Sequence, residues 1–146
     1  NGYQAYEVSS FSKPGYECNH NLHYWNIEPY LAFGPSAHGF DGQYRWSNSR
    51  SLDQYISCIL TGKSAISMRE KISAIGHINE KIGFGLRMKK GFAIKDIPKK
   101  YKMLIKSNIE NAQEKYPDCI DTKSNNITFT QKGMLYADEL IPSILL

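Results

Sequence analysis

The stretch MREKISAIGHINEKIGFGLRM, residues 68–88, sets the pattern for the second half of the chain. Apolar side chains recur in it at spacings of three and four residues, namely Ile72, Ile75, Ile78, Ile82 and Leu86. This spacing places all five on one face of an α-helix. Ser67 with Glu70 three residues later resembles a capping box, and Gly91 is a typical stop signal. We therefore predict one long helix over residues 68–88.

The residues that follow predict two more helices separated by a β-hairpin. Asp96-Ile97-Pro98 begins a helix that runs to Tyr116, and the turn at residues 124–126 joins two strands at 119–121 and 127–129. A last helix follows, with Thr130 as its N-cap. Its inward-facing residues are expected to be Met134, Leu135, Ala137, Leu140 and Ile141. The order helix, helix, hairpin, helix is that of a winged-helix-like module, which we expect to act as a scaffold against a partner domain.

The first half of the chain predicts short strands and loops, and the whole chain therefore belongs to the α+β class. Composition changes near residues 62–67, from loop-rich and aromatic to helical and lysine-rich. We place a boundary there, between domains at residues 1–63 and 64–146. From the N-terminus we expect a strand at 3–11, a turn at 13–15, a loop with a short helical turn at 16–28, a buried strand at 30–33, a loop at 36–50 and a helix at 52–61 capped by Ser51.

Composition and charge narrow the class of protein. The 146 residues are 41% hydrophobic and carry a net charge of +4 that is spread along the chain. Lys89-Lys90 and Lys99-Lys100 adjoin predicted turns, and we interpret them as solvated helix ends. A basic face would also suit a carboxylate-bearing ligand such as a porphyrin. No RNA- or DNA-binding signature accompanies these lysines, so we expect no nucleic-acid partner. No stretch reaches the roughly 18 apolar residues of a membrane span. Cys18, Cys58 and Cys119 are odd in number and far apart, which argues against disulfides and favours a reducing compartment, the cytoplasm.

Residues 18–25, which read Cys-Asn-His-Asn-Leu-His-Tyr-Trp, concentrate side chains that bind ligands. Imidazole is a common ligand of metals and haem iron, and aromatic rings offer flat faces to a flat macrocycle. Composition alone favours the other explanation, a hydrogen-bonded loop in which His20 and Asn21 bond backbone carbonyls. Cys18, His20 and His23 also suggest zinc, but a structural zinc site needs four ligands and His38 is the only further candidate nearby.

Residues 34–39, Gly-Pro-Ser-Ala-His-Gly, follow a predicted strand. Glycine in such a loop lets backbone N–H groups approach a ligand closely, although most loops of this composition are ordinary turns. The Gly-Lys-Ser/Thr ending of a phosphate loop is absent, and the glycine of a nucleophile elbow is missing after Ser36. No base stands at a recognisable spacing from Ser36 or Cys18, so we expect no nucleophilic catalysis.

Several motifs together resemble the oxygen-independent coproporphyrinogen III oxidase-like radical S-adenosylmethionine (radical SAM) family of HemN and HemW type. Residues 6–15 are similar to Y-E-[IV]-S-N-F-[AS]-K-P-G, and residues 30–38 to Y-L-G-x-G-P-G-A-H, with Ser10, Ala32 and Ser36 as departures. His20 to Trp25 fits H-N-x-x-Y-W, the motif of the HemW branch of haem chaperones. Weaker matches follow at 45–48 (R-x-x-N), 53–56, 84–91 (G-L-R-x-x-x-G), 130–133 and 137–138.

The resemblance implies a longer protein of which this chain is a C-terminal fragment. Residues 1–63 would form the last strands of a radical SAM partial β/α barrel and a connecting helix, and residues 64–146 the C-terminal domain of the HemN type. Asn1 in place of an initiator Met agrees with a boundary inside such a protein. The missing N-terminal barrel half would be the first partner, and without it we expect an exposed strand edge that favours self-association and leaves residues 1–50 partly ordered.

The resemblance also implies cofactors that these residues do not hold. In the family a Cys-x-x-x-Cys-x-x-Cys motif binds a 4Fe-4S cluster that cleaves S-adenosylmethionine. The three cysteines here lack that spacing, so we expect the fragment not to be an enzyme, while the longer protein is a candidate radical SAM oxidoreductase.

Two functions follow from the resemblance. The first is a haem chaperone that binds haem and delivers it to an acceptor protein. The second is an anaerobic coproporphyrinogen III oxidase, which decarboxylates its substrate oxidatively in porphyrin biosynthesis. The H-N-x-x-Y-W motif favours the chaperone, with His20 as the iron ligand. The haem-contact residues expected on this basis are His20, Asn21, Tyr24, Trp25, Gly34 and His38. A structural domain without a ligand of its own is the third interpretation.

Overall fold

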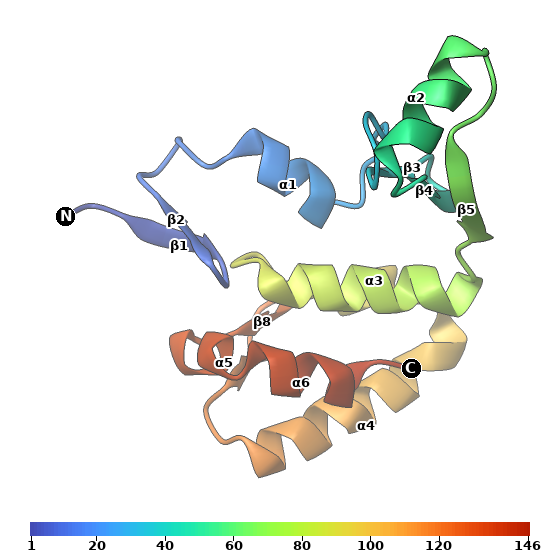
Figure 1. The fold of residues 1–146 in the computed structure, drawn as a ribbon. Helices are drawn as coiled ribbons and strands as arrows, with labels where there is room; N and C mark the ends of the chain where they lie inside the picture. The colour runs from blue at the N-terminus through green and yellow to red at the C-terminus, as the bar shows by residue number, and fades with distance from the viewer. The chain divides into compact units, whose positions relative to one another are not determined.

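A computed structural model describes all of residues 1–146 (Figure 1). The chain is mixed α and β, as predicted, and forms two compact units. The first comprises residues 1–27 and 74–146, and the second comprises residues 28–73. Each unit is described by itself. This division does not coincide with the boundary expected between residues 63 and 64, because the N-terminal hairpin packs with the C-terminal helices. The assignment of residues 1–63 and 64–146 to two domains of a longer protein stays a prediction.

The elements of the two units have the following bounds. The first unit contains β1 (Gln4–Glu7), β2 (Ser10–Ser12), α1 (Asn19–Trp25), α3 (Ala74–Arg87), β6 (Phe92–Ala93), the short 3-10 helix η1 (Ile94–Asp96), α4 (Lys99–Lys115), β7 (Ile120–Asp121), β8 (Asn126–Phe129), α5 (Gln131–Leu135) and α6 (Ala137–Ile144). The second unit contains β3 (His38–Phe40), β4 (Tyr44–Asn48), α2 (Leu52–Leu60) and β5 (Ile66–Lys71).

The core of the first unit lies among α3, α4 and α6, with α6 packed against both of the other helices (Figure 1). Helix α3 also packs on a three-stranded sheet of order β6-β8-β7. All three helices contribute fully buried aliphatic side chains, namely Ile82, Leu86, Ile105, Leu140 and Ile144. The sheet contributes Phe92, Ile120, Ile127 and Phe129 to the same cluster. Burial of these apolar groups is the main stabilisation of the unit.

The long helix predicted over residues 68–88 is confirmed in its C-terminal part and wrong in its first residues. Ile78, Ile82 and Leu86 are buried on one face of α3, as the spacing indicated, but the helix begins only at Ala74. Residues 66–71 form the strand β5, which pairs antiparallel with β4. The expected cap is therefore wrong, because the Ser67 hydroxyl donates a hydrogen bond to the Ser47 carbonyl at 3.1 Å. Pairing with β4 decided the conformation there, against the local helical pattern.

The C-terminal hairpin is confirmed, with Ile120 opposite Phe129 in the β7–β8 pair. Two details were not foreseen. Residues 92–93 add a third strand, since Phe92 pairs with Ile127. The last helix is interrupted at Tyr136, and Leu135, expected inside, is 83% exposed. The predicted cap is present, since the Gly133 N–H donates to the Thr130 hydroxyl at 3.1 Å.

The N-terminal segment forms a hairpin, where one strand was expected over residues 3–11. β1 and β2 pair antiparallel, with Ala5 opposite Phe11. The hairpin is joined to the end of α3, because the Val8 N–H donates to the Arg87 carbonyl at 2.9 Å and the Lys89 N–H donates to the Tyr6 carbonyl at 3.1 Å. The turn predicted at residues 13–15 is confirmed by the hydrogen bond from the Tyr16 N–H to the Lys13 carbonyl.

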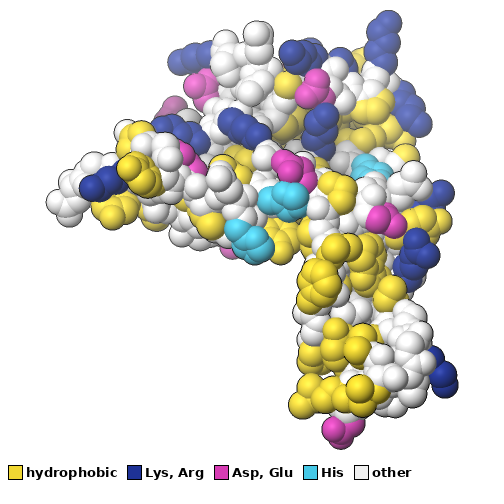
Figure 2. All heavy atoms as spheres, turned by 90° about the horizontal axis from the view of Figure 1, so that it is seen from above, with side chains coloured by type: hydrophobic (Ala, Val, Ile, Leu, Met, Phe, Trp, Pro, Cys, Tyr) yellow, Lys and Arg dark blue, Asp and Glu magenta, His cyan; other side chains and the backbone are white.

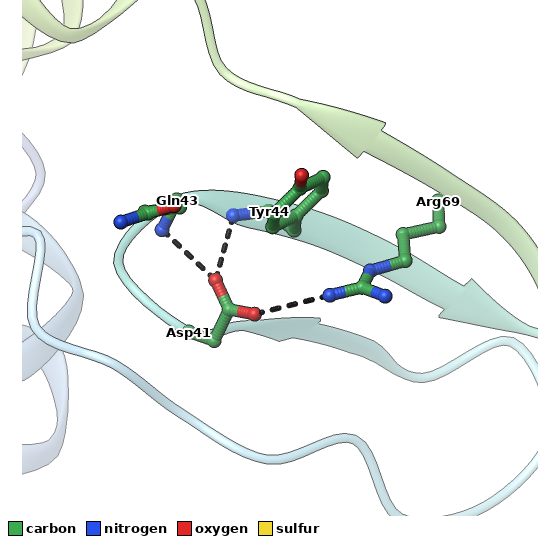
Figure 3. A network of polar contacts seen from close by, with 4 residues as sticks. All are labelled: Asp41, Gln43, Tyr44 and Arg69. Carbon is green, nitrogen blue, oxygen red and sulfur yellow. Dashed lines mark hydrogen bonds and ion pairs between the residues drawn. The ribbon is translucent and has the colours of Figure 1, made fainter.

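The second unit is a sheet of order β3-β4-β5 with the helix α2. The loop expected over residues 36–50 is wrong, because β3 and β4 form a hairpin closed by Asp41-Gly42. The Asp41 carboxylate accepts hydrogen bonds from the N–H groups of Gln43 and Tyr44, at 2.9 and 2.6 Å (Figure 3). Gly42 has a positive φ of 95°, which glycine tolerates best. The Asp41-Gly42 pair is itself a sequence signal for such a hairpin turn.

The predicted helix after Ser51 is confirmed as α2, and the Ser51 hydroxyl accepts a hydrogen bond from the Gln54 N–H. The strand predicted at residues 30–33 is wrong. Only Tyr30 pairs, in an isolated bridge with Phe40, while Leu31 and Phe33 are 70% and 79% exposed. None of the helices combines the length and the apolar character of a membrane-spanning segment.

Candidate functional site

Helix α1 carries four of the six predicted site residues. The helix has only seven residues and no side-chain cap at Cys18, so its own hydrogen bonds do not explain its stability. Contacts with the rest of the first unit hold it. The Asn21 amide donates to the Tyr6 hydroxyl at 3.2 Å. The Trp25 ring packs edge to face on Phe84, with ring centroids 5.6 Å apart.

The four residues divide between two faces of α1. Asn21 and Trp25 are one helical turn apart and face the unit, where the guanidinium of Arg87 lies 5.2 Å from the centre of the Trp25 ring. His20 and Tyr24 are also one turn apart and are exposed. Their rings meet edge to face with centroids 4.9 Å apart and an interplanar angle of 87°. The structure therefore brings His20 together with Tyr24 on the exposed face. Asn21 and Trp25 anchor the helix to the rest of the unit.

The exposed face of α1 has the chemistry of a metal-ligand site with an aromatic neighbour. His23 adds a second imidazole, whose centroid lies 6.2 Å from that of Tyr24. Histidine side chains lie at the surface in Figure 2, next to hydrophobic ones. An exposed imidazole that is fixed by a neighbouring ring is accessible to the iron of a bound macrocycle, and the tyrosine ring beside it offers further contact area.

Gly34 and His38 belong to the second unit. Gly34 has a positive φ of 96°, its N–H donates to the Tyr55 hydroxyl at 3.0 Å, and its carbonyl accepts from the Asn48 amide at the same distance. The Asn48 amide also reaches the Ala32 carbonyl at 3.3 Å, so one buried side chain holds the loop in place. His38 lies exposed at the start of β3, opposite Ser47.

The cysteine and histidine side chains of this chain do not gather into one ligand set. No group of three or more His, Cys, Asp or Glu side chains is arranged to hold a metal ion. Cys18, His20 and His23, the residues of the zinc alternative, therefore do not form even a set of three ligands. Cys18 is exposed, Cys119 is buried, and Cys58 belongs to the other unit, so the cysteines do not fit the ligand set of a 4Fe-4S cluster.

Sequence reasoning missed a cavity of about 630 Å³ in the first unit. Its lining residues that matter here are Trp25, Lys81, Met88, Lys90, Phe92 and Lys95. The pair Lys89-Lys90 was interpreted as a solvated helix end, but the Lys90 ammonium donates to the Asn26 side-chain carbonyl at 2.6 Å and so lies against α1. No local pattern reveals this, because the lining residues come from three separate segments.

No family model matches the chain, but individual relatives do. The heme chaperone HemW of Bacillus subtilis (strain 168) is 30% identical over 148 aligned residues, which cover 99% of this chain and 38% of that protein. The heme chaperone HemW of Mycobacterium tuberculosis (strain H37Rv) is 28% identical and covers 99% of this chain, which spans 35% of that protein. The chain thus spans little more than a third of the length of these relatives.

A solved structure agrees with these relatives. Coproporphyrinogen III oxidase (HemN) of Escherichia coli, a radical SAM enzyme, superimposes with a TM-score of 0.75 at 16% identity, over 98% of this chain and 37% of that one. At that identity the likeness shows the fold. Together with the relatives, it shows that the chain belongs to the oxygen-independent coproporphyrinogen III oxidase-like radical SAM family. Within the family it lies on the HemW branch.

Proposed function

We propose that this chain is the C-terminal part of a haem chaperone, which binds haem as its cargo and delivers it to acceptor proteins. The names of the HemW relatives from several species support this proposal. The observation that carries it for these residues is the exposed, ring-supported imidazole of His20 on α1. Haem iron accepts such an imidazole as an axial ligand.

The six residues predicted to contact haem have different parts in the proposal. His20 binds the iron, and Tyr24 lies beside the macrocycle. Asn21 and Trp25 fix the orientation of α1 through Tyr6 and Phe84. Gly34 and His38 belong to the other compact unit, and their contact with haem stays a prediction.

The remaining features of the proposal concern the longer protein. Residues 1–63 would complete its partial β/α barrel, whose N-terminal half supplies the ligands of the 4Fe-4S cluster and binds S-adenosylmethionine. Residues 64–146 would form its winged-helix-like C-terminal domain, and the protein would work in the cytoplasm. The cysteines of this chain do not fit the cluster, so we assign no radical step to these residues. In the absence of that N-terminal half, this chain would associate with itself through its exposed strand edge.

A haem titration tests the role of His20. We expect the intact chain to shift the Soret band of added haem, and we expect His20→Ala to lose the shift and at least about tenfold in affinity, the equivalent of roughly 1.4 kcal/mol. His23→Ala is the matched control, because it removes an imidazole from the same short helix. An unchanged band and affinity in His20→Ala would reject His20 as the ligand.

The oxidase is the second candidate, because the superimposed structure is that of an enzyme. The two candidates differ in what the full-length protein does with coproporphyrinogen III under anaerobic conditions and with S-adenosylmethionine supplied. The chaperone proposal expects no decarboxylated product, while haem binding persists. Turnover of coproporphyrinogen III would establish the oxidase instead.

A further inference from the structure

We propose that the cavity of about 630 Å³ in the first unit is a second subsite for the cargo, one that binds a flat apolar molecule through its carboxylates and does not need iron. This inference rests on the proposed function, because the proposed haem cargo is what identifies the ligand of the cavity as a porphyrin dicarboxylate. The cavity lies between the C-terminal end of α1, one side of α3 and the turn that leads into β6.

Two glycines allow the walls of the cavity to come together. Gly85 in α3 lies so close to the next strand that an added Cβ would stand 2.8 Å from the Cβ of Phe92. Gly91 has a positive φ of 66°, and a Cβ there would overlap the carbonyl of Ile127. The turn is further held by the Asn126 amide, which donates to the Lys90 carbonyl at 2.9 Å. The cavity is therefore built by the fold of the unit, and its shape does not depend on mobile side chains alone.

The charge of the lining suits a dianion. Lys81, Lys90 and Lys95 contribute three positive charges, against one negative charge from Asp96, which gives an excess of two. Lys81 is paired with Asp96 at 3.4 Å. Lys90 is held at the cavity by the Asn26 side chain. Lys90 and Lys95 are therefore the two cations available to a pair of carboxylates, and an ammonium–carboxylate hydrogen bond is stronger than a neutral one.

The other part of the lining suits a flat apolar body. Trp25, Met88 and Phe92 supply an indole, a thioether and a phenyl ring, and Ile27 adds an aliphatic side chain. Aromatic and methionine side chains adapt well to planar ligands. A volume of about 630 Å³ falls within the range of about 300–1,000 Å³ that is typical of small-molecule sites.

The cavity is separate from the proposed iron ligand. His20 and Trp25 are five residues apart on α1, and at about 100° per residue this separation leaves them roughly 140° apart around the helix axis. Trp25 lines the cavity and His20 does not. A porphyrin in the cavity is therefore held by its carboxylates and its ring, and a porphyrin at His20 by its iron.

Metal-free protoporphyrin IX and its dimethyl ester test this inference. The intact chain with Trp46→Phe leaves Trp25 as the one tryptophan, whose fluorescence reports binding in the cavity. We expect the diacid to quench it, and the ester to bind at least about tenfold more weakly because it lacks the charges that lysine recognises. The double variant Lys90→Gln, Lys95→Gln should bind the diacid more weakly by a similar factor. His20→Ala should bind the diacid with the affinity of the parent chain.

Lys99→Gln with Lys100→Gln is the matched control, since it removes two exposed lysines of α4 from the same unit. Circular dichroism of each variant checks that the fold persists. The inference is overturned if the diacid and the ester bind equally, if the Lys90 and Lys95 variant binds as the control does, or if the diacid causes no quenching. If His20→Ala loses the haem Soret shift while the Lys90 and Lys95 variant binds the diacid as the control does, the cavity inference alone has failed. If His20→Ala keeps the Soret shift while the lysine variant binds the diacid more weakly, the assignment of His20 alone has failed.

Discussion

The imidazole of His20 and the ring of Tyr24 meet edge to face on the exposed side of α1, with centroids 4.9 Å apart. Because this pair lies on a solvent-facing helix surface, it contributes little to folding, about 0.5 kcal/mol for such a pair. We therefore predict that His20→Ala and Tyr24→Ala leave the midpoint of urea unfolding nearly unchanged. Trp25→Ala should lower the free energy of unfolding by about 2 kcal/mol, since Trp25 packs on Phe84 and Arg87. Equal losses in all three variants would contradict this division of α1.

Asn48 holds the loop that carries Gly34. Its buried amide donates to the carbonyls of Ala32 and Gly34, at 3.3 and 3.0 Å. We predict that Asn48→Ala removes both side-chain hydrogen bonds and leaves the Gly34 carbonyl with only the Ala37 N–H, at 3.4 Å. The loss should cost about 1–3 kcal/mol and speed amide exchange over residues 32–37. Hydrogen exchange followed by mass spectrometry measures the change. Gln43→Ala, an exposed residue of the same unit, should leave exchange in that loop as it was.

Gly91 permits the turn between α3 and β6. Alanine there would combine a positive φ of 66° with an overlap between its Cβ and the Ile127 carbonyl. We predict that Gly91→Ala destabilises the first unit by about 2 kcal/mol or more, by backbone strain and displacement of the sheet. Gly15 serves as the comparison, because it has a positive φ of 84° but no atom within 4 Å of an added Cβ. Gly15→Ala should lower the free energy of unfolding by about 1 kcal/mol. Equal losses would show that the close approach is unimportant.

Asp41 makes the β3–β4 hairpin sensitive to acid. Hydrogen bonds from the N–H groups of Tyr44 and Gln43, together with the charge of Arg69, hold the pKa of its carboxyl below the ordinary value of 3.8 (Figure 3). Since the folded-state pKa is the lower one, the stabilisation is present above pH 3.8 and is lost as the pH falls through the folded-state value.

We predict that an NMR titration of the Asp41 carboxyl gives a midpoint below 3.8, with a parallel shift of the Tyr44 amide resonance. In Asp41→Asn the acid-dependent shift of Tyr44 should disappear. A midpoint above 3.8 would mean that the turn hydrogen bonds do not form in solution.

Local signals in the sequence predicted the structure correctly where the tertiary packing favoured the same conformation. The Ser51 cap of α2, the Thr130 cap of α5 and the Ser124-Asn125-Asn126 turn of the C-terminal hairpin were all predicted and are present, because each depends on neighbouring residues. The family resemblance was also readable from the sequence, since its motifs are short and ordered. By contrast, Ile66 to Lys71 was predicted as helix, and the strand it forms depends on a partner elsewhere in the chain.

The mixed α and β composition, the buried face of α3 and the family of the chain could be predicted from sequence patterns alone. The packing of residues 1–27 with residues 74–146, and the placement of His20 and Trp25 on different sides of α1, became apparent only in the folded chain. Only the tertiary structure also brought Lys90 and Lys95 to the cavity beside Trp25. The physical reason is that helix periodicity and turn chemistry act over a few residues, whereas sheet pairing and cavity walls join segments that are distant in the chain.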